Sequence, residues 1–123
     1  MEDCVFCKIV KGDLPSYKVY EDGEYLSFID IRPLSPGHIL VIPKKHYRFV
    51  WDVPDEAFKN YMSVVKKLAQ ALQNTFGTNM VSSKIVGEEV HHAHVWIFPN
   101  PDEATGDKND FEGNAQKIRS ALT

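Results

Sequence analysis

The sequence has no apolar run of the length that crosses a membrane. No segment approaches about twenty consecutive apolar residues. The start, Met1-Glu2-Asp3, also lacks the positive charge and the apolar stretch of a secretory signal. We therefore expect no membrane partner and a cytoplasmic, reducing location.

An excess of positive charge is missing as well. The chain has 14 Lys and Arg against 17 Asp and Glu, which gives a net charge of −3. Contact with a nucleic-acid backbone needs a basic surface, so we expect no nucleic-acid partner and a small-molecule target instead. The content of 43% hydrophobic and 25% charged residues is typical of a globular protein, and the length of 123 predicts one domain, residues 1–123.

Cysteine is scarce, and the two that are present, Cys4 and Cys7, are three positions apart. In a reducing compartment this spacing indicates metal ligation or redox exchange, and two inert buried thiols are a third possibility. A thioredoxin-like redox motif needs a βαβ pattern with a helix that opens at Cys4. The sequence predicts no such helix, which makes redox exchange the weaker interpretation.

Five segments have the apolar, β-branched and aromatic composition of strands, namely residues 17–21, 25–29, 38–42, 79–86 and 90–98. Asp22-Gly23 separates the first two, and this dipeptide accepts the positive φ angles of a tight hairpin. A turn at Gly87 separates the last two. The first pair is therefore expected to be antiparallel.

One long helix is predicted to follow Asp52, whose side chain can cap it. Pro54, Asp55 and Glu56 suit the first turn, and Gly77 is expected to end the helix. Apolar residues recur at three- and four-residue steps and form one stripe that would lie on the sheet: Phe58, Tyr61, Met62, Val65, Leu68, Ala69, Leu72 and Phe76.

The C-terminal part, residues 100–123, is predicted to be a polar tail followed by a short closing helix. Pro101 and Gly106 mark the tail, and Phe111, Ile118 and Leu122 give the helix its apolar residues. With the strands and the long helix, this predicts an α+β fold.

Three histidines cluster in residues 90–99. If this segment is a strand, His92, His94 and Trp96 project from one face, because side chains two apart share a face. Two neighbouring imidazoles suit metal ligation or a histidine nucleophile with an orienting neighbour. A hydrolase that binds a catalytic metal through both His92 and His94 is one alternative, although it leaves the cysteines unexplained.

Four segments in order resemble the histidine triad (HIT) family: residues 4–15, 28–33, 37–44 and 90–94. The resemblance covers nearly the whole chain. It implies a five-stranded antiparallel sheet with one long helix and a short C-terminal helix. It also implies a homodimer in which two such sheets join. Such a protein would bind purine nucleotides and cleave a nucleotidyl α-phosphate bond through a covalent histidine intermediate.

By the same resemblance, His94 matches the nucleophile and His92 the first histidine of the triad, while Trp96 replaces the third. A backbone carbonyl near His92 is expected to hold one ring nitrogen of His94 and so fix its tautomer. An indole donates a hydrogen bond but transfers no proton at neutral pH, so we expect anhydride substrates to be favoured over phosphoramidates. Two alternatives remain. Trp96 is a packed aromatic residue that closes the pocket, or the protein is a nucleotide-binding module with little turnover.

The resemblance further implies a structural Zn²⁺ held by Cys4, Cys7, His46 and His92. The residues that it places at the nucleotide are Phe6, Ile9, Phe28, Asp30, Ile31 and Ser83, with Asp30 at the ribose hydroxyls and Ser83 near the phosphate. Glu88 and Glu89 depart from the family pattern. They would repel a phosphate that they faced, unless they lie in a solvated turn. His38, at the start of a strand, is expected to be structural.

Overall fold

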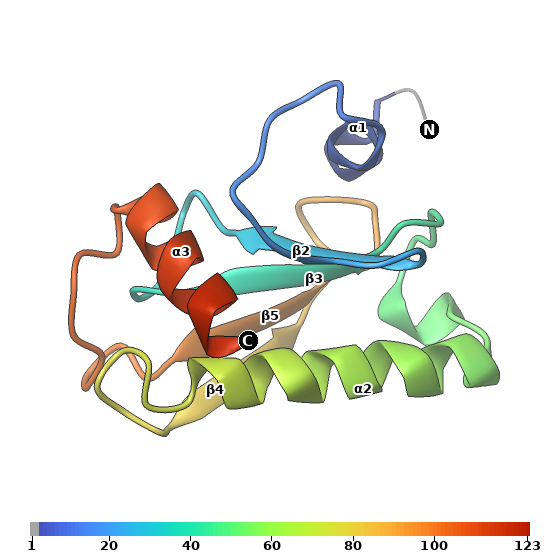
Figure 1. Ribbon diagram of the computed structural model, residues 1–123. Coiled ribbons are helices and arrows are strands. Elements are labelled where there is room, and N and C mark those ends of the chain that lie inside the picture. Colours follow the sequence, from blue (N-terminus) through green and yellow to red (C-terminus); the bar gives the residue numbers. More distant parts are fainter. Residues whose placement is uncertain (1–2) are drawn as a thin grey trace.

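The computed structural model describes residues 3–123 and contains one five-stranded antiparallel sheet (Figure 1). Its spatial order is β1-β2-β3-β5-β4. The strands are β1 (Lys18–Glu21), β2 (Tyr25–Ile29), β3 (Ile39–Pro43), β4 (Val81–Ile85) and β5 (Val95–Pro99). The predicted α+β fold is confirmed.

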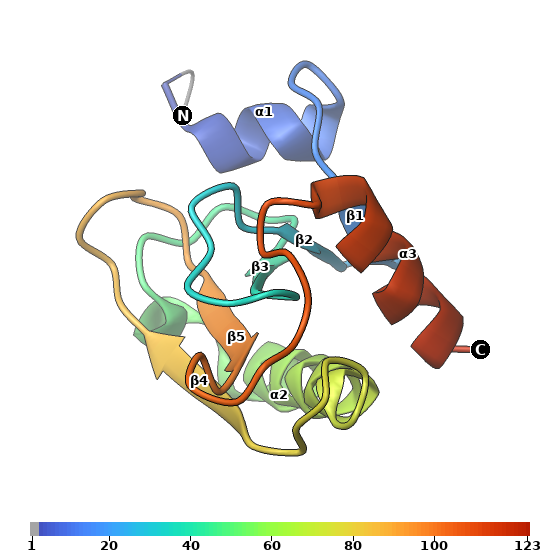
Figure 2. The ribbon, with the colours of Figure 1, turned by 90° about the vertical axis from the view of Figure 1, so that its left-hand side faces the viewer.

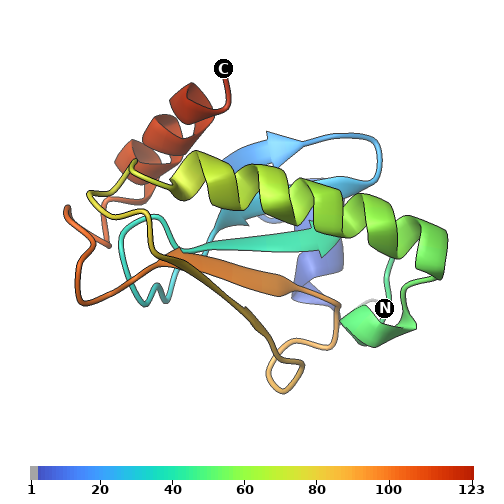
Figure 3. The same cartoon turned by 90° about the horizontal axis from the view of Figure 1, so that it is seen from below.

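Helices cover both faces of the sheet. The long helix α2 (Asp55–Leu72) runs across one face, as Figure 3 shows, and α3 (Phe111–Ala121) packs against α2, β1 and β2. The short helix α1 (Val5–Lys11) lies over the opposite face (Figures 1 and 2). A single 3-10 turn, η1 (Val50–Asp52), precedes α2.

Alternation along the strands divides the apolar side chains between two cores. The core beneath α2 and α3 includes Ile29, Ile39 and Val41 of the central strands. The core beneath α1 includes their neighbours Phe28 and Leu40. Since both faces of β2 and β3 are buried, these strands are mostly apolar instead of alternating with polar residues, and Ser27, the polar residue of β2, is buried as well.

The apolar stripe of α2 packs on the sheet as predicted. Tyr61, Leu68 and Leu72 are fully buried, and the Tyr61 hydroxyl donates a 2.6 Å hydrogen bond to the carbonyl of Val41. This bond ties the middle of α2 to a central strand of the sheet.

The predicted limits of the long helix are wrong at both ends. Asp52 lies in η1, where its carboxylate accepts from the backbone N–H of Phe49 at 3.0 Å instead of capping α2. The residue that precedes α2 is Pro54, which makes no side-chain cap. The helix ends at Leu72, and Phe76 enters the core from the turn that follows.

The hairpin between β1 and β2 is held by a side chain and needs no left-handed glycine. Asp22 Oδ1 accepts from the backbone N–H groups of Glu24 and Tyr25, each at 2.8 Å. The hairpin is present as predicted. The positive φ angles expected at Asp22-Gly23 are wrong, because neither residue has a positive φ.

Two further differences concern the segments that carry the candidate site. Helix α1 was not predicted: the Cys4 thiol caps it by accepting from the backbone N–H of Cys7 at 3.3 Å, an uncommon cap that composition does not signal. Strand β5 begins at Val95, so residues 91–94 are not strand. Among the described residues, no helix is both long enough and apolar enough to cross a membrane.

Candidate active site and metal centre

A cavity of about 730 Å³ opens on the α1 face of the sheet. Its walls come from α1, from the chain that leads to β1, and from the loop that joins β4 to β5. Its floor follows from the strand register: Phe28 lies opposite Leu40, Leu40 opposite Trp96, and Trp96 opposite Lys84. All four side chains line the cavity.

Most residues that the sequence placed at a nucleotide line this cavity. They are Phe6, Ile9, Phe28, Asp30 and Ile31. Phe6 meets Phe28 edge to face with ring centroids 5.5 Å apart, so an aromatic corner closes one end of the apolar wall.

Ser83 does not line the cavity, and its predicted place near a phosphate is wrong. It pairs with Ile97 and shares a face of β4 with Val81 and Ile85, which pack against the core beneath α2. Lys84, one residue later, lies on the cavity side instead. A shift of one residue along a strand moves a side chain to the opposite face of the sheet, and the sequence alone did not show which residues of β4 face the cavity.

His94 lies at the cavity with one ring nitrogen engaged. Its Nδ1 is 2.7 Å from the backbone carbonyl oxygen of His92, which is the contact expected from the sequence. A carbonyl can only accept, so Nδ1 carries the hydrogen and Nε2 has the free lone pair. Within residues 3–123, Nε2 has no hydrogen-bond partner, and the ring lines the cavity although only 5% of the residue is exposed.

Trp96 lines the same cavity two residues further along β5. Its ring lies 5.3 Å from the ring of buried His38, and the ammonium of Lys84 is 5.5 Å from the indole centroid. The indole is half-buried and forms part of the cavity floor, so it does not seal the cavity above His94.

The loop between β4 and β5 brings two carboxylates to the rim. Glu88 and Glu89 are both exposed and both line the cavity. The sequence left open whether these glutamates face a bound phosphate or lie in a solvated turn. In the structure they lie in a solvated turn and also face the cavity. Lys84 and these glutamates give the cavity lining charges of both signs.

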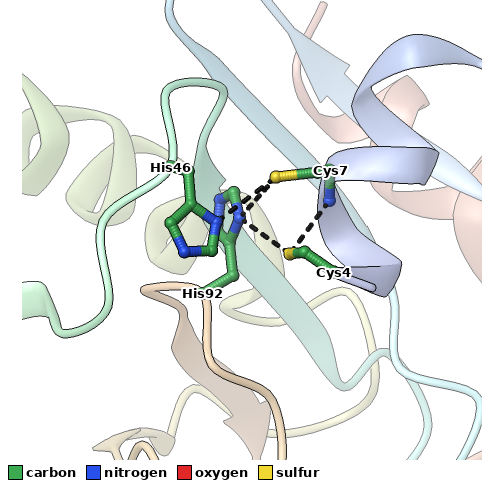
Figure 4. A group of neighbouring side chains, drawn as sticks. All are labelled: Cys4, Cys7, His46 and His92. Carbon is green, nitrogen blue, oxygen red and sulfur yellow. Dashed lines mark hydrogen bonds between the residues drawn. The ribbon is translucent and has the colours of Figure 1, made fainter. Parts of the chain in front are cut away.

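The two cysteines meet two histidines at the N-terminal end of α1 (Figure 4). The ligand atoms of Cys4, Cys7, His46 and His92 all lie within 4.8 Å of one another. Nδ1 of His92 is 3.4 Å from Sγ of Cys4 and 3.5 Å from Sγ of Cys7, and Nδ1 of His46 is 3.3 Å from Sγ of Cys7. The four residues form a possible metal site.

The second nitrogen of His92 fixes which atom faces this cluster. Nε2 donates to the carbonyl of Pro43 at 2.8 Å, so the lone pair of Nδ1 points at the thiols. Burial lowers the pKa of His92, which keeps the ring neutral, the form that binds metals. Burial and the neighbouring Cys4 thiol raise the pKa of Cys7 to about 11, so its proton must be displaced by a metal.

His92 and His94 therefore belong to different centres. His92 joins the cysteines, and His94 lies outside that cluster and faces the cavity. The alternative of one catalytic metal bound by both histidines is wrong. The Phe6 ring lies between the two centres, with its centroid 5.9 Å from that of His92 and 5.3 Å from that of His94.

Known proteins resemble this chain in sequence. The HIT domain family model matches residues 11–103, about three quarters of the chain. The chain belongs to the HIT family. It is 42% identical to Protein hit of Bacillus subtilis, over 85% of this chain and 76% of that protein. It is 39% identical to an adenosine 5'-monophosphoramidase of Saccharomyces cerevisiae, over 84% of this chain and 66% of that protein.

Solved structures of HIT proteins superpose on nearly the whole chain. A Hit-like protein from Bartonella henselae matches with a TM-score of 0.87 and 33% identity, covering 98% of both chains. A zinc-bound histidine triad family protein from Mycobacterium smegmatis matches with a TM-score of 0.80 and 32% identity, covering 98% of this chain and 94% of that one.

Proposed function

We propose that this HIT protein is a nucleotide hydrolase or nucleotidyltransferase in which His94 attacks the α-phosphorus of a bound nucleotide. The observation that carries the proposal is the geometry of His94: Nδ1–H is held by the His92 carbonyl, and the other nitrogen faces a cavity of nucleotide size. Kinship with a named adenosine 5'-monophosphoramidase supports it.

In the first step, a bond forms between Nε2 of His94 and phosphorus while the bond from phosphorus to the leaving group breaks. The bonding electron pair departs with the leaving group. The resulting nucleotidyl-imidazolium keeps its Nδ1–H bond to the His92 carbonyl, which stabilises the positive ring. Water then forms a bond to phosphorus and loses a proton to solvent, while the bond between phosphorus and Nε2 breaks and its electron pair returns to Nε2. This releases the nucleoside monophosphate and neutral His94.

The leaving group is proposed to be one that departs without a proton. The indole N–H of Trp96 can donate a hydrogen bond but not a proton, so anhydrides such as adenylates or dinucleoside polyphosphates are favoured over phosphoramidates. The base would lie in the apolar wall around Phe6, Ile9, Phe28 and Ile31, with the ribose hydroxyls at Asp30.

We propose Zn²⁺ for the cluster of two cysteines and two histidines. Tetrahedral zinc with bonds of about 2.3 Å to sulfur and 2.0 Å to nitrogen separates the two kinds of ligand by about 3.5 Å. The nitrogen–sulfur distances of 3.3–3.5 Å agree with that separation. Four protein ligands leave no open position, so the metal would be structural. The free thiols also fit the reducing, cytoplasmic location expected from the sequence.

We also propose that the protein is a homodimer. Helix α3 contacts β1 at one edge of the sheet, while β4 at the other edge has exposed residues along its middle, Ser82 to Lys84. An open edge strand presents backbone groups that can pair with a second copy. The β4 edge is therefore the proposed place where two sheets join.

The covalent intermediate provides the decisive experiment. The protein is incubated with an activated adenylate, quenched, digested and analysed by mass spectrometry. We expect nucleotidyl mass on the peptide that carries His94, and its loss together with turnover in His94→Ala. His91→Ala is the matched control, because His91 is exposed in the same segment and does not line the cavity.

A binding module without turnover is the alternative that the two rim glutamates favour, because they disfavour a polyanionic substrate. Nucleotide binding with no adduct, and hydrolysis unchanged in His94→Ala, would establish that alternative and contradict the enzyme.

A further inference from the structure

His38 and Asp30 face one another behind the cavity. The register that pairs Ile29 with Ile39 continues by one residue, and the backbone N–H of Asp30 donates to the His38 carbonyl at 3.0 Å. Their side chains therefore project on the same side of the sheet. Asp30 reaches the cavity, while His38 is completely buried.

Nδ1 of His38 is a hydrogen-bond acceptor for the backbone. Nδ1 accepts from the backbone N–H of Leu34 at 3.0 Å, so the hydrogen of the neutral ring lies on Nε2. Burial lowers the pKa of His38, against the opposing effect of the Asp30 charge, which keeps the ring neutral. The ring lies 5.3 Å from that of Trp96 and 5.2 Å from that of Phe98, and this packing limits its rotation.

The other nitrogen points at the carboxylate. Nε2 of His38 is 3.5 Å from Oδ2 of Asp30 and satisfies no hydrogen bond with any residue from 3 to 123. A buried N–H without a partner costs free energy, and Asp30 is the acceptor beside it. The other oxygen of the carboxylate, Oδ1, already accepts from the backbone N–H of Arg32 at 2.8 Å.

From this geometry we propose that His38 is a positioning residue for sugar recognition, whose Nε2–H holds the Asp30 carboxylate toward the two ribose hydroxyls of a nucleotide. The inference rests on the proposed function, because it assumes that a nucleotide occupies the cavity. Held from behind by His38 and from one side by Arg32, Asp30 keeps its remaining lone pairs for the ligand. His38 itself does not touch the sugar.

Two amide substitutions separate the two nitrogens of His38. In His38→Asn, the short side chain can still accept from the Leu34 N–H but cannot reach Asp30. In His38→Gln, the amide N–H can take the place of Nε2, while the acceptor for Leu34 is lost. Ser35→Ala is the matched stability control, because it removes another buried hydrogen bond of the same loop, from Ser35 Oγ to the Pro99 carbonyl.

The experiment measures affinity for adenosine 5'-monophosphate and for its 2',3'-dideoxy analogue by calorimetry, using zinc-loaded protein. Hydrogen bonds to a charged group predict that the wild type prefers the ribose form by about 10- to 100-fold. Asp30→Asn and His38→Asn are both expected to reduce this ratio at least about fivefold, and the double variant to lose no more than Asp30→Asn alone. His38→Gln and Ser35→Ala are expected to keep the ratio even where they lower the melting temperature.

Failure of the inference can be told apart from failure of the proposed function. If the wild type binds neither nucleotide, the proposed function is wrong and the inference falls with it. If Asp30→Asn reduces the ratio but His38→Asn keeps it, or if Ser35→Ala reduces it equally, His38 is only structural. If Asp30→Asn leaves the ratio unchanged, the carboxylate does not read the sugar, and the role of His38 is overturned even though nucleotide binding stands.

Discussion

Trp96 is the residue that most distinguishes the chemistry expected of this site. It lies two residues from His94 and lines the same cavity. The cation nearest to its ring in the structure, the ammonium of Lys84, is 5.5 Å from the ring centroid. The positive charge beside Trp96 thus comes from the neighbouring strand β4.

We predict that Trp96→His raises hydrolysis of a nucleoside phosphoramidate relative to a matched anhydride. An imidazole can donate a proton to the departing amine, an effect worth about 10²–10⁴ in rate, so the ratio of the two kcat/KM values should rise by at least about tenfold. Trp96→Phe is the control, because it keeps an aromatic ring and adds no proton donor. Equal ratios in Trp96→His and the wild type would show that the third position does not select the leaving group.

His38 also makes stability depend on pH. Its pKa is lowered in the folded protein from 6.5, so the unfolded chain takes up this proton first as the pH falls. The free energy of unfolding should therefore fall as the pH drops below about 6.5, by up to about 1.4 kcal/mol per pH unit for this group. Above pH 7 both states are unprotonated, and the contribution is absent.

Denaturant titrations of the wild type and His38→Gln between pH 5 and 8 isolate this contribution. The pH dependence of the metal cluster is shared by both proteins and cancels in the difference. We expect a steeper decline in the wild type below pH 6.5. Parallel curves would mean that His38 titrates alike in the folded and unfolded states.

The sequence predicted much of the site at the residue scale. Spacing and resemblance placed His94 and five of the six proposed nucleotide residues at the cavity, and the four proposed metal ligands lie in one cluster. The sixth, Ser83, failed because a strand register cannot be read to one residue from composition. Lys84 carried no signal of its own, since it becomes visible only when β4 is paired with β5.

Among the elements, α1 contributes to both the cavity and the metal cluster. It has only seven residues, yet it contributes Phe6 and Ile9 to the cavity wall and Cys7 to the metal cluster. A helix this short is marginal without tertiary contacts. We infer that a metal bound by the cluster holds α1 on the sheet and thereby shapes the cavity.

Metal removal should therefore weaken nucleotide binding before it abolishes the fold. We predict that chelation, or Cys7→Ser, lowers the melting temperature by at least about 5 °C and also lowers affinity for a nucleoside monophosphate. The measurements are thermal denaturation, metal content and calorimetric binding. Chelator should have no further effect on Cys7→Ser. Unchanged nucleotide affinity in the metal-free protein would show that the metal is not needed to hold α1 in place over the cavity.

The helices and strands with a strong apolar periodicity were predicted, whereas an element that forms through specific side-chain contacts was missed. The strands and α2 follow from apolar patterns, whereas α1 depends on a thiol cap and on distant histidines. The end of α2 was misplaced because Phe76 continues the apolar spacing although the chain has already turned.

At the scale of the whole molecule, the two edges of the sheet differ. The β1 edge contacts α3, and the β4 edge has exposed side chains. We predict that sedimentation velocity gives a particle of twice the 14.0 kDa chain mass. Ser83→Glu, which would bring like charges together across paired β4 strands, should shift it toward the monomer. A monomer at micromolar concentration would contradict the dimer, which, like the single domain of residues 1–123, stays a prediction.

His92 serves both centres of the molecule with different atoms. Its ring belongs to the metal cluster, while its backbone oxygen holds the proton of the proposed nucleophile. A displacement of His92 would therefore change both the geometry of the metal ligands and the tautomer of the His94 ring. A related protein that lacks the two cysteines would need another interaction to hold the His92 backbone carbonyl against Nδ1 of the nucleophilic histidine.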